Sequence, residues 1–277
     1  MPFQNLWREL KVPIESPLRA GYEFAADVER AYSALMGTAF AEAEAGLSGT
    51  LFYAGELDAE GRALMVAANI AGAASLAATG DRGAQRQGVR DGIADFLVNS
   101  LDETLRILKN QLRKREPVAV CVSLAPKAIE REMRERGVEP DLLRTGVPAL
   151  PYHEALVLPD AEAAENALDK TPALIAWSVA SAPAHWLPKL DAIATDCLDK
   201  DAWRARRWLR LAPRYLGRAA QGLRLLGCDR EVAARFVEQV GQAVDRGEIP
   251  VACEIRCCFR GLCDTYRFAP EASPRSA

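Results

Sequence analysis

The C-terminal part of the chain concentrates the residues that could do covalent chemistry. It carries a cluster of cysteines interleaved with arginines, namely Cys253, Cys257, Cys258 and Cys263. Their spacings match neither a zinc knuckle nor the usual iron–sulfur runs, so a metal site is the weaker interpretation. A core strand with alternating buried cysteines and exposed arginines is an equal alternative to a reactive thiol site.

A second candidate site lies in the stretch FYAGELDAEG, from Phe52 to Gly61. An apolar run that leads through a glycine-containing turn into an alanine-rich segment is typical of the unit that holds a dinucleotide. Gly55 and Gly61 would let main-chain amides approach pyrophosphate closely. The turn also carries acids where glycines are expected, at Glu56, Asp58 and Glu60. Because carboxylates repel a diphosphate, the pattern indicates a nucleotide-type turn with altered chemistry.

Two polar residues follow the almost continuous apolar run at 117–122, which is typical of a parallel strand buried on both faces. Ser123 and Lys127 lie where ligands bind in open α/β sheets, so Ser123 could hydrogen-bond a ligand and Lys127 could neutralise an anion. The favoured alternative is that Ser123 caps the next helix and that Lys127 is solvated.

Arg144, Thr145 and His153 flank a further expected strand end. His153 and Glu154 could form an acid–base pair, because a carboxylate orients an imidazole and shifts its proton affinity. Adjacent residues on a strand point to opposite faces, however, so a histidine without a catalytic role is favoured.

Strands and helices alternate through the first half of the chain, which predicts a doubly wound, mostly parallel Rossmann-like sheet. The expected strands are 50–54, 93–98, 117–122 and 138–143, and the expected helices are 20–45, 64–78, 100–115 and 128–136. A capping box at Ser100 and Glu103 begins the third of these helices. The C-terminal half is expected to add helices at 186–198, 202–226 (a pair broken near Pro213) and 229–246, with a strand at 173–180 and a β-prone end at 249–268.

Composition and charge limit the classes of partner that the protein is expected to bind. The net charge of −3 gives no global field for nucleic acid or anionic lipid, and no apolar run is long enough to span a membrane. The basic and aromatic segment 203–218 is expected to be a buried stripe with a solvated arginine face rather than a nucleic-acid surface. Without an export signal the protein is expected to be cytoplasmic, with reduced thiols as the default. Two histidines argue against a histidine-rich metal site.

The order of several motifs resembles the Rossmann-like NAD-binding domain of the urocanase family. These motifs are AG at 54–55, IAGAASL at 70–76, SLDETL at 100–105 and RERGVEPD at 134–141. A terminal motif, IRCCFRGLCDTYRF at 255–268, resembles the family's I-R-x-x-F-C-R-G segment. The resemblance implies a shortened relative, because urocanases are about twice as long.

The resemblance also implies roles for individual residues. Gly55, Gly61, Ser123 and Thr145 would bind the cofactor. Cys258 and Cys263 would be the catalytic thiols, although the family's reactive cysteine stands between Phe and Arg, which are adjacent here. Arg256, Arg260 and Arg267 would hold an anionic substrate, because a guanidinium grips a carboxylate at two points.

Two functions follow as alternatives. The first is a urocanase-like lyase, a hydratase that uses NAD as an electrophile on a small conjugated carboxylate. The second is a catalytically degenerate ligand-binding or regulatory relative that has lost NAD binding, for which no cofactor is expected. Under either alternative, the protein is expected to bind a small-molecule ligand and to form a homodimer.

The sequence divides into four expected parts. They are an N-terminal arm (1–19), a Rossmann-like domain (20–160), a mostly helical part packed on the sheet (161–268) and a disordered tail (269–277).

Overall fold

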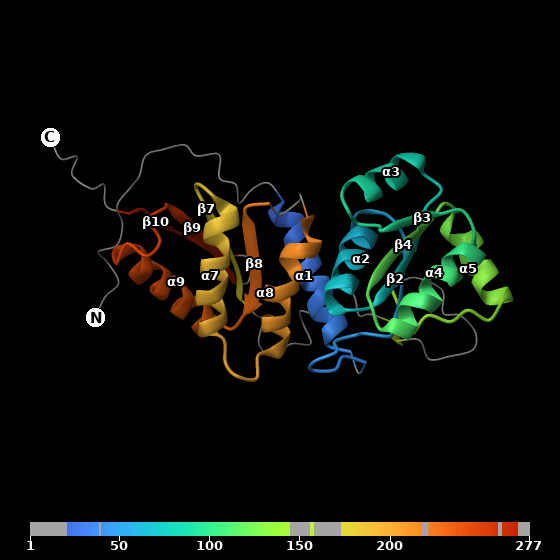
Figure 1. Ribbon diagram of the computed structural model, residues 1–277, viewed down its shortest axis with the longest axis horizontal. Helices are drawn as coiled ribbons and strands as arrows, with labels where there is room; N and C mark the ends of the chain where they lie inside the picture. The colour runs from blue at the N-terminus through green and yellow to red at the C-terminus, as the bar shows by residue number, and fades with distance from the viewer. Residues whose placement is uncertain are drawn as a thin grey trace.

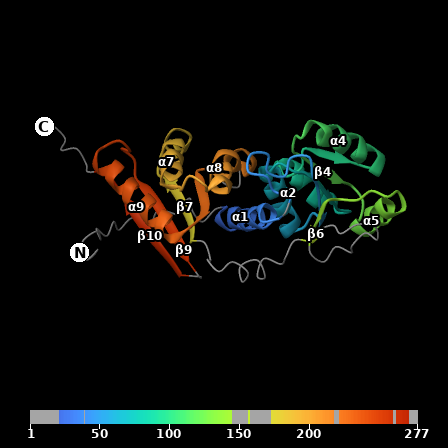
Figure 2. The ribbon, with the colours of Figure 1, turned by 90° about the horizontal axis from the view of Figure 1, so that it is seen from below.

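The computed structural model contains two β-sheets at opposite ends of an elongated molecule, with helix α1 (Tyr22–Met36) between them (Figures 1 and 2). It describes residues 21–38, 40–144, 156–157, 173–217, 221–259 and 262–270. The predicted arm, almost all of the predicted tail, and His153 with Glu154 lie outside these ranges.

The first sheet has six strands in the order β3-β4-β2-β1-β5-β6, and every neighbouring pair is parallel. The strands are β1 (Leu51–Glu56), β2 (Ala74–Ala78), β3 (Phe96–Val98), β4 (Val118–Val122), β5 (Leu142–Leu143) and β6 (Leu156–Val157). The predicted Rossmann-like fold class is therefore confirmed.

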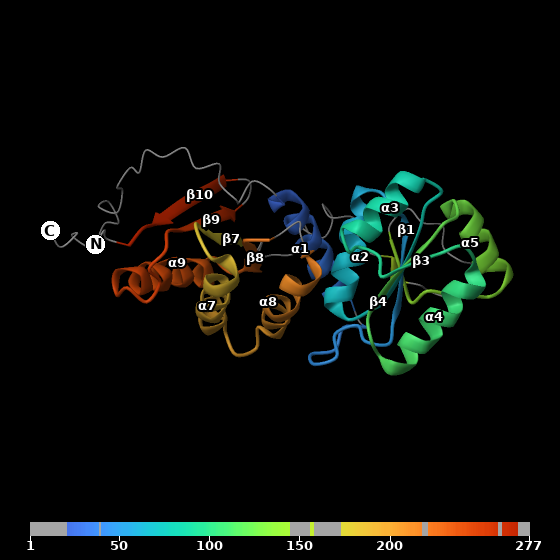
Figure 3. The same cartoon turned by 45° about the horizontal axis from the view of Figure 1, so that its top comes forward.

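Helices cover both faces of this sheet (Figure 3). They are α2 (Ala59–Ala71), α3 (Arg82–Arg90), α4 (Leu101–Lys114) and α5 (Pro126–Glu135). Neighbouring strand residues point to opposite faces. Phe52 accordingly joins the core that includes α2, and Tyr53 joins a separate core with α4 and α5. Ser100 begins α4 as predicted, because its hydroxyl accepts from the Glu103 amide at 3.3 Å.

The predicted helix at 64–78 is wrong in its second half. Helix α2 ends at Ala71, where Gly72 takes a φ of 99°, and residues Ala74–Ala78 form β2 between β1 and β4. Alanine favours helix in isolation, but this central strand is completely buried between two parallel neighbours. Packing in the middle of the sheet therefore overrides the local preference.

The second sheet is antiparallel, with four strands in the order β10-β9-β7-β8. The strands are β7 (Ala173–Val179), β8 (Leu223–Cys228), β9 (Cys253–Phe259) and β10 (Leu262–Phe268), and the helices are α7 (Pro183–Cys197), α8 (Trp203–Tyr215) and α9 (Arg230–Asp245). The sequence predicted α7, α8, α9, strand β7 and the β-prone end that contains β9 and β10, but not the sheet as a unit. The predicted second helix up to 226 is wrong, because Leu223–Cys228 is strand β8 paired with β7.

Helix α1 connects the two halves of the core. It packs against α2 of the first half and against β8 of the second, and one continuous set of buried apolar side chains runs through all three elements. None of the helices in the described ranges is both long enough and apolar enough to cross a bilayer.

Candidate functional site

The turn between β1 and α2 has the close packing of a nucleotide-type turn. Gly55 has a φ of 71° at an irregularity in the pairing of β1 with β2. A Cβ on Gly61 would lie 2.0 Å from the main-chain oxygen of Glu56, so only glycine lets α2 begin this close to β1. The structure thus places both predicted glycines in this turn.

One amide that could bind a phosphate in this turn, that of Gly61, is occupied by the protein itself. Asp58 is the N-cap of α2, and its Oδ1 accepts a hydrogen bond from the Gly61 amide at 2.8 Å. A helix N-terminus attracts anions through such amides and through the helix dipole. In this protein the anion is a carboxylate of the chain.

Arg144 completes this arrangement from the end of the neighbouring strand β5. Its guanidinium donates to both carboxylate oxygens of Asp58, at 2.9 and 3.1 Å, and it also pairs with Glu60. Its side chain is only 16% exposed. Burial works to lower the pKa of Arg144, but the two carboxylates outweigh it and the pKa is raised. Sequence reasoning noted Arg144 only as a strand-end residue, because nothing local links it to acids more than eighty residues earlier.

These ion pairs lie at the topological switch point of the sheet. Strand β1 has β2 on one side and β5 on the other, and the chain leaves β1 towards β2. In open α/β sheets, ligands bind outside the carboxyl ends of the strands at such a point. Here the turn after β1 is bridged to the residue after β5.

The geometry does not fit the pyrophosphate of NAD. The Gly61 amide is already bonded to Asp58, and the carboxylates of Asp58 and Glu60 both pair with the single guanidinium of Arg144, which also donates to the main-chain oxygen of Glu56 at 3.5 Å. A diphosphate would have to displace Asp58 and would meet surplus negative charge.

Ser123 lies at the same carboxyl edge, directly after β4, and its amide donates to the Val98 oxygen at 2.7 Å. The N-cap of α5 is Ala125, so the expectation that Ser123 caps this helix is wrong. The chain turns through two further residues before α5 begins at Pro126, which explains the difference. Thr145, the other predicted cofactor residue, lies outside the described residues.

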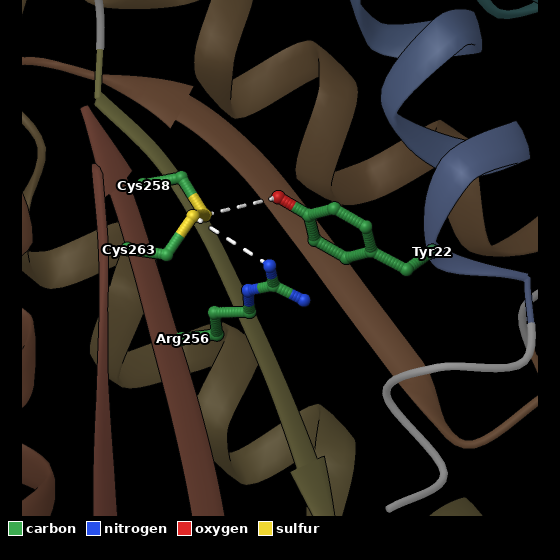
Figure 4. Close-up of a disulfide and its surroundings, with 4 residues drawn as sticks. All are labelled: Tyr22, Arg256, Cys258 and Cys263. Carbon is green, nitrogen blue, oxygen red and sulfur yellow. Dashed lines mark hydrogen bonds between the residues drawn. A yellow bond between two sulfur atoms is a disulfide. The ribbon is translucent and has the colours of Figure 1, made fainter. Parts of the chain in front are cut away.

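The predicted thiol site is found on the β9–β10 hairpin. Cys258 and Cys263 are directly opposite each other across the hairpin and form a disulfide (Figure 4). The sequence had favoured reduced thiols. The register of the hairpin brings the two residues together, with a Cα–Cα distance of 4.1 Å. In the bonded form neither sulfur is a nucleophile, so the predicted catalytic role requires reduction.

Polar groups surround this disulfide. The Arg256 guanidinium donates to Cys263 Sγ at 3.6 Å, and the Tyr22 hydroxyl donates to Cys258 Sγ at 3.4 Å (Figure 4). Arg267 shares the strand face of Cys263 and pairs with Glu254 at 3.0 Å. The structure therefore gathers two predicted arginines and both predicted thiols on one surface, while Arg260 lies outside the described residues.

The other cysteines of the described chain are unsuited to covalent chemistry. Cys121, Cys197, Cys228 and Cys253 are buried, and Cys257 is half-buried. Burial raises the pKa of Cys121, Cys253 and Cys257 to about 11 in each case, and it also raises the pKa of Cys197 and Cys228. Within the described ranges no group of cysteine, histidine and acidic side chains could hold a metal ion.

The two sets of predicted site residues do not meet within one chain. Figures 1, 2 and 3 all place the β9–β10 hairpin at the opposite end of the molecule from the first sheet. The turn with Gly55 and Gly61 belongs to the first sheet, whereas Cys258 and Cys263 belong to the second.

Comparison with protein families agrees with the topology. The sequence model of the family described as the urocanase Rossmann-like domain matches residues 28–169 of this chain. This range begins within α1 and contains all six strands of the first sheet. The match does not extend to the β9–β10 hairpin, so the resemblance of the terminal motif stays a prediction.

Proposed function

The chain belongs to the urocanase family through its Rossmann-like domain, and we propose that it is a ligand-binding or regulatory member that does not use NAD. Family members hold NAD in this domain. The observation that carries the proposal is the internal anion site, in which Asp58 binds the Gly61 amide and Arg144.

One further feature supports this proposal. The predicted thiol, arginine and cofactor groups could act on one substrate only if they lined one cavity. In this chain Cys258 and Arg256 stand on a different sheet from Gly55 and Gly61. The scaffold alone does not confer the chemistry of the family.

The direct test is to measure NAD binding by the purified protein. We expect denaturation to release no nicotinamide nucleotide, and we expect excess NAD to leave the melting temperature unchanged. A ligand present at a hundred times its Kd would stabilise the fold by about 2.7 kcal/mol, which a thermal melt resolves readily. Release of NAD in stoichiometric amounts, or hydration of urocanate by the protein, would overturn the proposal.

A variant with fewer charges tests whether the carboxylates of the turn prevent NAD from binding. Asp58→Ser with Glu60→Gln keeps a capping hydroxyl at the start of α2 but removes two charges and frees Arg144. We expect this double variant to bind NAD measurably more tightly than the natural protein. Adding Arg144→Gln should abolish the gain, and Glu135→Gln, an exposed acid on α5, is the matched control. An unchanged affinity in the double variant would contradict the electrostatic argument.

A further inference from the structure

The two residues of the Cys258–Cys263 disulfide differ in exposure. Cys263 is exposed on the edge strand β10, whereas Cys258 is half-buried on β9. Phe268, also on β10, lies against Gly241 of α9, since a Cβ added to Gly241 would come within 2.9 Å of its ring. Residues an odd number of positions apart on a strand point to opposite faces. The disulfide therefore lies on the face of the sheet that α9 does not cover.

Each sulfur has its own stabilising partner for negative charge. The Tyr22 hydroxyl donates to Cys258 Sγ at 3.4 Å, and Arg256 donates to Cys263 Sγ at 3.6 Å. The Arg256 guanidinium also lies over the Tyr22 ring, 4.8 Å from its centroid. Hydrogen bonds strengthen when the acceptor is ionised, so both partners favour thiolate over thiol.

We propose that Cys258 and Cys263 form a thiol–disulfide exchange site for a low-molecular-weight thiol of the glutathione class. The incoming thiolate attacks the sulfur of Cys263, the more exposed residue of the pair. The bond between the two cysteines breaks, and its electron pair leaves on Cys258 as a thiolate that accepts from Tyr22. A mixed disulfide then joins Cys263 to the small thiol.

A second equivalent of the small thiol completes the reaction. As its thiolate, it attacks the sulfur of the small molecule in the mixed disulfide and releases the Cys263 thiolate beside Arg256. In total, two small thiols are oxidised to their disulfide, and the protein gains two electrons and two protons. The reverse sequence, with the oxidised small molecule as the electron acceptor, restores the protein disulfide.

The reaction is expected at this pair because burial makes the thiols of the other cysteines harder to ionise. Burial raises the pKa of Cys121, Cys253 and Cys257 to about 11 in each case, so their thiolate fraction at neutral pH is lower than that of an ordinary cysteine. Since the thiolate is the reactive form, these residues react slowly whatever the redox buffer.

The exchange site also contacts the helix that joins the two halves. Tyr22 is the first residue of α1, which packs against α2 and β8. Its hydroxyl has a neutral acceptor in the disulfide and a charged acceptor in the Cys258 thiolate. Reduction therefore changes the charge beside the first residue of α1, independently of whether the first sheet binds NAD.

The first test is a redox titration of the intact protein in mixtures of reduced and oxidised glutathione. Samples are quenched in acid, alkylated and mapped by mass spectrometry. We expect Cys258 and Cys263 to change together and reversibly, while Cys121 and Cys253 are labelled only after denaturation. A pair that stays oxidised in excess reduced glutathione, or labelling of all cysteines in parallel, would overturn the proposal.

The second test separates the roles of the two sulfurs. Cys258→Ser leaves only the exposed thiol of the pair, and Cys263→Ser leaves only the half-buried one. We expect oxidised glutathione to modify the first variant at least about tenfold faster than the second, because thiol access limits exchange. Equal or reversed rates would refute the assignment of Cys263 as the attacked sulfur.

The third test concerns Arg256. In the Cys258→Ser background, Arg256→Gln is expected to lower the thiolate fraction of Cys263 about fivefold at neutral pH. The rate should fall only about two- to threefold, since a more basic thiolate is also more nucleophilic, and the pH profile should move upward. Arg246→Gln removes the same charge at the end of α9, on the other face of the sheet, where Arg246 pairs with Glu248; it is the control and should change neither the rate nor the pH profile. An Arg256 variant that matches this control would refute the role of the guanidinium.

Discussion

Arg207 is expected to hold the two halves of the molecule together. It projects from α8, yet its guanidinium donates to the main-chain oxygens of Glu44, Ile70 and Ala71, at 3.0 to 3.3 Å. Two of these carbonyls belong to the last turn of α2, where the helix has no further amides to bond them. We therefore choose Arg207→Met, which keeps the length of the apolar stem and removes every donor.

The size of the effect follows from these contacts. A hydrogen bond from a charged donor contributes about 1.5–3 kcal/mol, so three of them give a gross loss of about 5–9 kcal/mol. Burial of the guanidinium opposes this gain, and it also lowers the pKa of Arg207. Because Arg207→Met has no charged group to bury, it avoids the desolvation penalty of the guanidinium, which is on the order of several kcal/mol. The net loss of unfolding free energy is expected to be about 2–4 kcal/mol.

Urea unfolding provides the assay, followed by far-ultraviolet circular dichroism and by tryptophan fluorescence. The chain has no tryptophan between Trp7 and Trp177, so fluorescence reports mainly on the C-terminal half, whereas circular dichroism reports on both. We expect the midpoint to fall in both signals and the two transitions to separate, because the hydrogen bonds of Arg207 between α8 and α2 are lost.

Arg210→Met is the matched control for this experiment. Arg210 is exposed on the same helix, and its replacement should change the unfolding free energy by less than about 0.5 kcal/mol. If Arg207→Met were as mild as this control, the three carbonyl contacts would not stabilise the fold and the reasoning would be refuted.

Two further predictions concern buried features. Glu29 is buried, and its pKa is raised mainly by burial, against the opposing effects of the Ser33 hydroxyl, Arg30 and the Gly227 amide. Its contribution to stability is complete below the unfolded pKa and is lost as pH rises through the folded pKa, at about 1.4 kcal/mol for each unit of difference. Glu29→Gln should flatten this decline in urea titrations between pH 4 and 8; parallel curves for the two proteins would contradict it. Gly61→Ala should lower the unfolding free energy by about 1–3 kcal/mol, because the new methyl group meets the Glu56 oxygen at 2.0 Å. Thermal melts would compare it with Gly80→Ala, whose nearest new contact is at 3.9 Å, and equal losses would count against the packing argument.

Local pattern was sufficient where one element decides its own structure. The apolar run at Val118–Val122 and the hydroxyl of Ser100 mark a buried strand and a helix start whatever lies around them. The order of such elements also predicted the parallel sheet, because strands that alternate with helices have few other ways to pack. The family resemblance of this half is confirmed by the match at residues 28–169.

Local pattern failed where the environment of a segment decides its structure. Ala74–Ala78 and Leu223–Cys228 both have the composition of helices, but each pairs with a neighbouring strand. Strand pairing depends on partners far along the chain, and no single stretch of sequence contains that information.

The amino-acid sequence by itself determined the class of the first domain, the glycines that bring α2 close to β1, and the three acids that alter the turn. Only the tertiary structure decided what those acids do. It brings Arg144 to Asp58, Arg207 to the end of α2, and Cys263 opposite Cys258. The physical reason is that hydrogen bonds and ion pairs act over a few ångströms, so their partners are chosen by how sheets and helices pack rather than by distance along the chain.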